Sequence, residues 1–149
     1  MIKTILLIHG PNLNLLGKRD PVHYGKLTLF EIEKMAKSEA SKYGFKLRSF
    51  QSNHEGALID FLQKNSQKAC GIIINPGALT HYSYALYDAL LDTRLPCIEV
   101  HLSDVKNREQ FRKISVTAPA CKAVFSGGKG KSYLEGIKFL ANFIKSKNA

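Results

Sequence analysis

The chain has 149 residues, of which 44% are hydrophobic, and this size and composition suit one globular domain with one core. No apolar run is long enough to cross a membrane, and the short apolar start lacks the small-residue cleavage pattern of a signal peptide. The net charge of +10 is spread along the chain rather than gathered in basic blocks. It therefore favours attraction for a small anion, and nucleic-acid binding stays a minor alternative.

Apolar runs and helical periodicity alternate along the chain, which predicts an α/β domain. The predicted strands cover residues 4–8, 45–50, 71–74, 97–100 and 122–125. The predicted helices cover residues 29–43, 55–67, 80–93 and 131–145, with a further short helix within 103–112. Thr28 and Glu31 have the capping-box spacing that begins a helix, and Gly44 is well placed to end it.

This alternation predicts a parallel sheet with helices on both faces, joined by right-handed crossovers. With five strands in a single domain of residues 1–149, the prediction is a flavodoxin-like three-layer sandwich with strand order 2-1-3-4-5. In sheets of this kind, ligands bind beyond the carboxyl ends of the strands, near the switch in strand order.

The three cysteines, Cys70, Cys97 and Cys121, predict reduced core residues in a cytoplasmic protein. Their number is odd, no CxxC motif occurs, and Cys97 lies in a predicted apolar strand while the other two directly precede one. A catalytic cysteine is disfavoured because a reactive thiol needs a polar, electropositive setting.

Residues 8–25 are predicted to form a long loop, because three glycines and two prolines interrupt them. The loop follows the first strand and carries Asn12, Arg19 and Tyr24, side chains that can do chemistry. An α/β domain often places its active site on such a loop, and the alternative is a solvated surface loop.

Glu99 and His101 are two residues apart at the end of the fourth strand, so they face the same side. A carboxylate beside an imidazole can fix its tautomer and prepare it as a general acid. The alternative is an ordinary polar strand end. The five histidines show no metal-binding spacing, so no metal is predicted.

Other polar residues near the predicted strand ends leave two interpretations open. His81 follows the Asn75 turn and is either a capping residue or a ligand-binding group. Arg108 and Arg112 stand at i, i+4 and form either a solvated basic face or an anion site. Residues 128–132, GKGKS, lack the first glycine of a phosphate loop and are interpreted as a strand-to-helix turn.

Four segments, GPNLNLLGKRDPVHYG, NPGALTHYSYALYDAL, EVHLS and REQFR, stand in an order and spacing that resemble type II 3-dehydroquinate dehydratase. The resemblance covers essentially the whole chain. It implies a hydro-lyase that converts 3-dehydroquinate to 3-dehydroshikimate by anti elimination through an enolate, in the shikimate pathway of aromatic amino-acid biosynthesis or in quinate breakdown. It also implies no metal or organic cofactor, and a homododecamer built from trimers.

The resemblance also implies roles for individual residues. Tyr24 matches the base that removes a proton alpha to the ketone, and Arg19 matches the residue that favours its phenolate. Asn12 matches the amide that holds a water against the enolate oxygen. His101 matches the acid that protonates the departing hydroxyl, with Glu99 orienting it.

Six further residues match substrate-binding positions of the family. The carboxylate site corresponds to Asn75 with the backbone amides of Leu102 and Ser103, and the hydroxyl-binding groups to His81, Arg112 and a neighbouring subunit's Asp88. The chain departs from the family pattern at Asp104 and at Lys106-Asn107, which bears on subunit contacts and on the rim of the site. The alternatives are a catalytically silent module that binds a small acid and, more remotely, a nucleotide or RNA binder.

Overall fold

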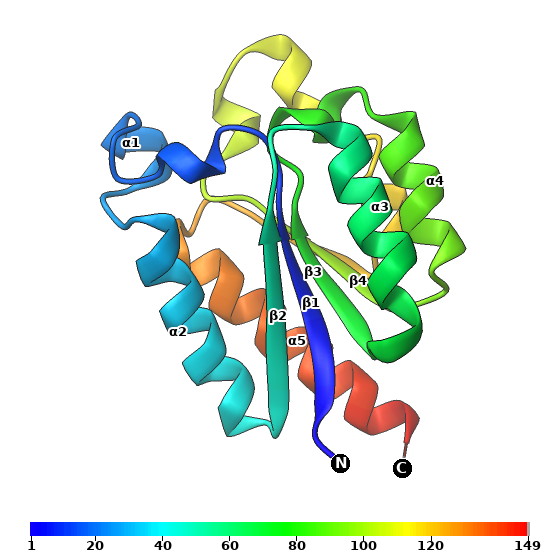
Figure 1. Cartoon of the computed structure of the whole chain (residues 1–149). Helices are drawn as coiled ribbons and strands as arrows, with labels where there is room; N and C mark the ends of the chain where they lie inside the picture. Colours follow the sequence, from blue (N-terminus) through cyan, green and yellow to red (C-terminus); the bar gives the residue numbers. More distant parts are fainter. Residues whose placement is uncertain (149) are drawn as a thin grey trace.

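The computed structural model describes residues 1–148 and contains one parallel sheet with strand order β2-β1-β3-β4-β5 (Figure 1). The strands are β1 (Lys3–His9), β2 (Phe45–Gln51), β3 (Gly71–Asn75), β4 (Cys97–Val100) and β5 (Ala123–Phe125). The α-helices are α1 (Pro21–Tyr24), α2 (Leu29–Lys42), α3 (Glu55–Asn65), α4 (Tyr84–Asp92) and α5 (Gly130–Lys147). The predicted flavodoxin-like strand order is confirmed.

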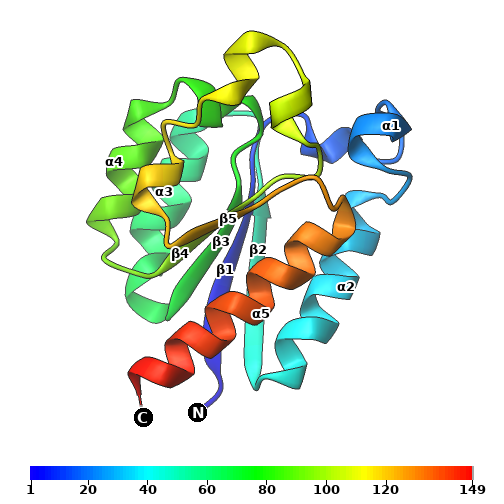
Figure 2. The same cartoon turned by 180° about the vertical axis from the view of Figure 1, so that it is seen from behind.

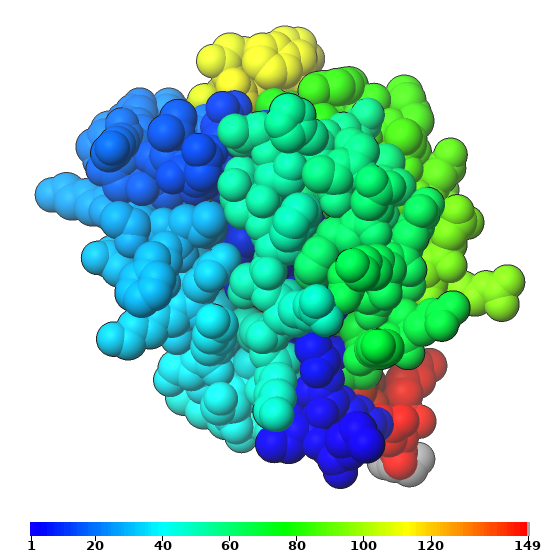
Figure 3. Space-filling view, viewed as in Figure 1, coloured from blue at the N-terminus to red at the C-terminus, as the bar shows by residue number. Residues whose placement is uncertain are grey.

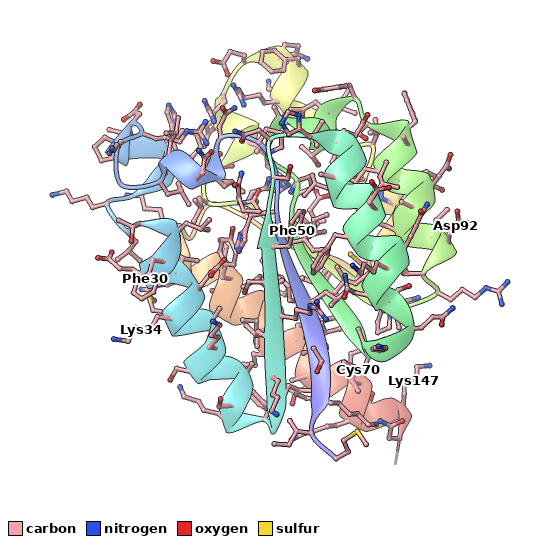
Figure 4. The ribbon with its side chains drawn as sticks, in the orientation of Figure 1. Phe30, Lys34, Phe50, Cys70, Asp92 and Lys147 are labelled. Atoms are coloured by element: carbon pink, nitrogen blue, oxygen red, sulfur yellow. The ribbon has the colours of Figure 1, made fainter. Side chains whose placement is uncertain are left out.

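Helices cover both faces of the sheet, α2 and α5 on one and α3 and α4 on the other (Figures 1 and 2). Alternate residues of β1 enter different cores: Ile5 and Leu7 pack toward α2 and α5, while Leu6 and Ile8 pack toward α3 and α4. Phe50 of β2 lies beside α3, and Phe30 projects outward from α2 (Figure 4). Burial on both faces explains why the central strands are continuous apolar runs.

The predicted capping box at α2 is confirmed. The Glu31 backbone N–H donates to Thr28 Oγ1 at 3.2 Å, and the Thr28 N–H donates to Glu31 Oε2 at 3.1 Å. A cap of this kind is worth about 1 kcal/mol. Gly44 follows the helix with a φ of 82°, a conformation that glycine adopts without steric cost.

The opening loop differs from its prediction because it contains a 3-10 turn (Leu13–Leu15) and the short helix α1. Pro21 stands at the first position of α1, where its fixed φ suits a helix and its missing N–H does no harm. Asp20 caps the helix by accepting from the Val22 N–H at 2.9 Å. The dense prolines and glycines therefore shorten helices in this stretch without excluding them.

Two other predicted helices have different bounds. Residues 80–82 belong to a 3-10 turn (Gly77–His81) and its end, and α4 begins only after Ser83, whose side chain accepts from the Leu86 N–H at 3.0 Å. The predicted helix 55–67 ends as α3 at Asn65 and continues as a 3-10 turn (Ser66–Lys68). Helical periodicity alone does not show where a side-chain cap starts a new helix.

The two ends of the sheet have different characters. Both chain termini and Cys70 lie at one end (Figures 1 and 4). The opening loop lies at the other end and borders the end of β2, where the Asn12 N–H donates to Asn53 Oδ1 at 2.9 Å (Figure 3).

All three cysteines are free, and burial raises the pKa of the Cys97 thiol. Within residues 1–148, none of the helices is both long and apolar enough to cross a membrane.

Candidate functional site

The loops after β1 and β3 touch through their backbones at the carboxyl end of the sheet. The Gly10 N–H donates to the Asn75 carbonyl at 2.7 Å. A methyl group at Gly10 would come within 2.2 Å of the Pro76 carbonyl oxygen, and one at Gly77 within 2.9 Å of the Pro11 oxygen. The two glycines are thus required for the close approach that brings the loop amides to one site.

A cavity of about 90 Å³ lies between these loops and the segment that follows β4. It is lined by nine of the eleven predicted site residues: Asn12, Arg19, Tyr24, Asn75, His81, His101, Leu102, Ser103 and Arg112. A larger hollow of about 500 Å³ lies near the chain termini, but within residues 1–148 its lining has no histidine, tyrosine or carboxylate. The smaller cavity is therefore the candidate site for acid-base chemistry.

Two guanidinium groups, those of Arg19 and Arg108, contact Tyr24, and that of Arg112 lines the same cavity. Arg108 Nη1 donates to the Tyr24 hydroxyl at 2.7 Å, and Arg19 Cζ lies 3.7 Å from the centre of the Tyr24 ring. Burial lowers the pKa of Arg19; a charge on Tyr24 opposes that shift, while Arg108 and Arg112 add to it. Converging cations stabilise a phenolate at Tyr24 or an anion beside it.

Arg108, which the sequence left as part of either a solvated basic face or an anion site, is a residue of the candidate site. The sequence contains a signal for it. A tyrosine base needs its pKa lowered from about 10 to near 7, which takes roughly 4 kcal/mol. One guanidinium close to the hydroxyl supplies barely that much. A tyrosine base beside Arg19 therefore needs a second cation nearby, and the sequence offers Arg108 and Arg112 as candidates. The structure shows that it is Arg108, on the segment after β4, that bonds the hydroxyl, while Arg19 stacks on the ring face.

Glu99 and His101 form a buried pair at the end of β4. His101 Nε2 lies 2.9 Å from Glu99 Oε2, and the two residues are 6% and 0% exposed. Burial alone would raise the pKa of Glu99, but the hydrogen bond and charge of His101, with hydroxyl donors, hold that pKa below its ordinary value. The bond to Glu99 leaves Nδ1 as the His101 nitrogen that is free to meet a ligand.

Three hydroxyl groups complete the surroundings of Glu99, and none of them was predicted. Thr80 and Ser115 donate to Glu99 Oε2 at 3.1 and 2.9 Å, and Thr117 donates to Oε1. The Val116 N–H donates to the Thr80 carbonyl at 2.7 Å, which fixes the two segments together. A carboxylate with this many donors stays ionised and rigid, so it can orient the imidazole.

Asn75 and the start of the segment after β4 present N–H groups to the cavity. Asn75 is 3% exposed, and its Oδ1 accepts from the Gly77 N–H at 3.1 Å. The backbone N–H groups of Leu102 and Ser103 find no backbone carbonyl as acceptor within residues 1–148. Free amides in a cavity rich in arginine suit a carboxylate ligand.

His81 and Asp88 occupy different surroundings. His81 Nδ1 lies 2.8 Å from the Ile114 carbonyl, which can only accept, so Nδ1 carries the proton and Nε2 is left as an acceptor. Asp88 is exposed on α4 and does not line the cavity of its own chain. A second hollow of about 480 Å³ adjoins the site and shares His81, His101 and Arg112 with it.

The chain departs from the family pattern at Asp104 and Lys106-Asn107, and these residues have a local structural role. Asp104 Oδ1 accepts from the Lys106 N–H at 3.1 Å, and the Asn107 side chain donates to Asp104 Oδ2 at 2.7 Å. These bonds cap the 3-10 turn (Val105–Asn107) that precedes Arg108.

At residues 128–132 the Gly128 N–H donates to Ser132 Oγ, as expected of a strand-to-helix turn.

Comparisons with known proteins identify the family and the fold of the chain. The family model for class II dehydroquinase matches residues 3–141. The chain is 54% identical over 136 residues to a 3-dehydroquinate dehydratase of Roseiflexus castenholzii, covering 91% of this chain and 87% of that protein. The type II dehydroquinase structure from Butyrivibrio crossotus is 44% identical, has a TM-score of 0.89, and is matched over 93% of this chain and 97% of its own. The one from Propionibacterium acnes is 32% identical, with a TM-score of 0.90 over 95% and 98% of the two chains.

Proposed function

The chain belongs to the class II dehydroquinase family, and on that premise we propose that it is a hydro-lyase that dehydrates 3-dehydroquinate to 3-dehydroshikimate. One structural observation supports the proposal independently of family membership. Tyr24 with its cations and His101 with its buried carboxylate line the same cavity, which thus holds one candidate base and one candidate acid. The role would be in the shikimate pathway or in quinate breakdown.

In the proposed reaction, the Tyr24 phenolate takes a proton from the carbon alpha to the substrate ketone. The electron pair of that C–H bond moves to the carbonyl oxygen and forms an enolate, which Asn12 stabilises through a bound water. Collapse of the enolate forms the C=C bond and breaks the C–O bond of the beta hydroxyl. His101 protonates this hydroxyl, which departs as water; Tyr24 then releases its proton to solvent and His101 takes one up from solvent, which resets both groups.

The remaining groups would hold the substrate in place. Asn75 and the backbone amides of Leu102 and Ser103 bind its carboxylate, while His81 and Arg112 bind its hydroxyls. The support is geometric: all five line the cavity, and His81 Nε2 can accept from a hydroxyl. Positioning of this kind makes the proton transfers effectively intramolecular.

The test is an ultraviolet assay for the conjugated enone product, with purified protein and 3-dehydroquinate. The wild type should produce it, and Tyr24→Phe should not. If no product forms although calorimetry detects 3-dehydroquinate binding, the chain is the catalytically silent binding module instead. Biosynthetic and catabolic roles share this reaction, so growth assays with and without quinate would separate them.

A homo-oligomer would complete the site. We propose a dodecamer of trimers in which a neighbouring subunit's Asp88 reaches the hydroxyl-binding groups. Two features support it: the hollow beside His81 and Arg112, and the exposed apolar side chains that follow His81 or flank Arg112 in the chain, Tyr82, Tyr84, Phe111 and Ile114. Asp88→Ala should raise KM and leave the fold intact, and light scattering that shows a fully active monomer would exclude the proposal.

We also propose a cytoplasmic location, on the ground of the three free cysteines.

A further inference from the structure

A buried chain of polar side chains runs from the surface of α2 to the floor of the cavity. It joins Glu33 of α2, His9 of β1, Tyr133 of α5 and Asn75 of β3. Successive contacts measure 3.1 Å each: Glu33 Oε1 to His9 Nε2, His9 Nδ1 to the Tyr133 hydroxyl, and that hydroxyl to Asn75 Nδ2. His9 and Tyr133 are 0% and 1% exposed, so bulk solvent does not reach them.

The protons in this chain can be placed from donor and acceptor chemistry. Asn75 Nδ2 can only donate, so the Tyr133 oxygen accepts from it. Burial raises the pKa of Tyr133, so its hydroxyl keeps its single proton. That proton has His9 Nδ1 as its partner, which makes Nδ1 an acceptor and puts the His9 proton on Nε2.

Glu33 favours this tautomer of His9. Its carboxylate lies 3.1 Å from Nε2, although the N–H direction is off the line between the atoms, so the contact is an attraction rather than a well-aligned hydrogen bond. The interaction with His9 lowers the pKa of Glu33 against the opposing effect of burial. An ionised Glu33 therefore holds the proton on Nε2 and keeps Nδ1 free to accept from Tyr133.

The chain determines which atom Asn75 shows to the cavity. Its Oδ1 is occupied by the Gly77 N–H and one Nδ2 proton by the Tyr133 oxygen, which leaves the second Nδ2 proton for a ligand. A flipped amide would place N–H against N–H at Gly77. It would also place Oδ1 against the Tyr133 oxygen, whose only proton already goes to His9.

We propose that His9 and Tyr133 are positioning residues whose buried hydrogen-bond chain presents an Asn75 N–H donor to the substrate carboxylate. This rests on the proposed function and names two residues that it does not use. Hydrophobic side chains would fill these positions at lower desolvation cost, so the polar chain needs a reason beyond packing.

The decisive variant is Tyr133→Phe, which removes one oxygen and keeps the ring that packs in the core. It frees Asn75 Nδ2 from its partner, so only the Gly77 N–H still holds the amide and its N–H is aimed less firmly at the cavity. Steady-state kinetics should show KM raised about tenfold, the effect of losing one hydrogen bond, with kcat within threefold of the wild type. Tyr43→Phe, at the far end of α2, is the matched control and should leave KM unchanged.

A pair of His9 variants separates positioning from packing. Asn can place an acceptor oxygen where Nδ1 stands, so His9→Asn should keep KM within threefold of the wild type. His9→Phe keeps a ring but has no acceptor, and should raise KM as Tyr133→Phe does. The double variant with both Phe substitutions should be no worse than either alone, because the two residues act as one chain.

Thermal unfolding of each variant checks that it folds. If folded Tyr133→Phe has wild-type KM, or if His9→Asn and His9→Phe raise KM equally, the inference is wrong. Should Tyr133→Phe not fold, the His9 pair decides. Failure of the proposed function looks different, because the wild type would then form no enone. Calorimetric binding of 3-dehydroquinate would in that case replace KM as the measure.

Discussion

Glu99→Gln isolates the charge that orients His101. The substitution keeps the size of the side chain and an oxygen that can accept from His101, Thr80 and Ser115. The new amide NH₂ would meet Thr117, whose hydroxyl can turn to accept from it. The fold should therefore survive, and the main change is the loss of one negative charge that is 0% exposed.

The size of the effect follows from the geometry of the pair. An N–O contact of 2.9 Å puts the charges of a protonated His101 and Glu99 roughly 4 Å apart, worth about 4 kcal/mol at an effective dielectric near 20. The hydrogen bond that Gln retains recovers about 1 kcal/mol. The imidazolium that serves as general acid therefore loses about 3 kcal/mol of stabilisation, and kcat should fall roughly 100-fold at neutral pH.

Stability provides a second measure of the same charge. The folded-state pKa of Glu99 lies below the ordinary glutamate value of 4.5, so its ionisation stabilises the native protein above that pH. This contribution disappears as pH falls through the folded-state pKa. Urea unfolding should show the wild type more stable than Glu99→Gln at pH 7, with the difference shrinking below pH 4.5.

The assays are the enone absorbance for kcat and urea unfolding at pH 7 and pH 4. Glu135→Gln, on the exposed face of α5, is the control for removing a carboxylate and should match the wild type in both. A Glu99→Gln enzyme with kcat within threefold of the wild type would refute the reasoning. It would mean that an oxygen acceptor, without charge, is enough to orient His101.

Three further predictions concern the base and the class of mechanism. Tyr24→Phe should lose turnover by about 100- to 10,000-fold yet bind 3-dehydroquinate in calorimetry; substantial turnover would place the base elsewhere, with His81 the next candidate. Arg108→Met removes the cation 2.7 Å from the Tyr24 oxygen and should reduce kcat roughly 10- to 100-fold, while an unchanged basic limb of the pH–rate profile would argue against its role. Neither EDTA nor borohydride with substrate should inactivate the enzyme; a lysine adduct of substrate mass, or activity restored by zinc after EDTA, would contradict this.

Most of the fold could be read from the sequence because local patterns determine it. The apolar runs of β1 and β3 and the capping box at Thr28 are short-range signals, and the structure bears them out. The strand order was predicted because five strands that alternate with helices in one small domain fit the flavodoxin-like order. Element bounds were less accessible, since the Asp20 and Ser83 side-chain caps that set α1 and α4 are single interactions within otherwise ambiguous stretches.

The sequence by itself also indicated the candidate site, because nine of its proposed residues lie at or beyond the carboxyl ends of parallel strands, which meet at one edge of the sheet. Only the tertiary structure decided which side chains meet. It placed Arg108 rather than Arg19 on the Tyr24 hydroxyl and enclosed Glu99 in three hydroxyls. It also joined His9 to Tyr133 across 124 positions of sequence. Contacts over such separations depend on how helices pack on the sheet, and no local pattern in the chain encodes that packing.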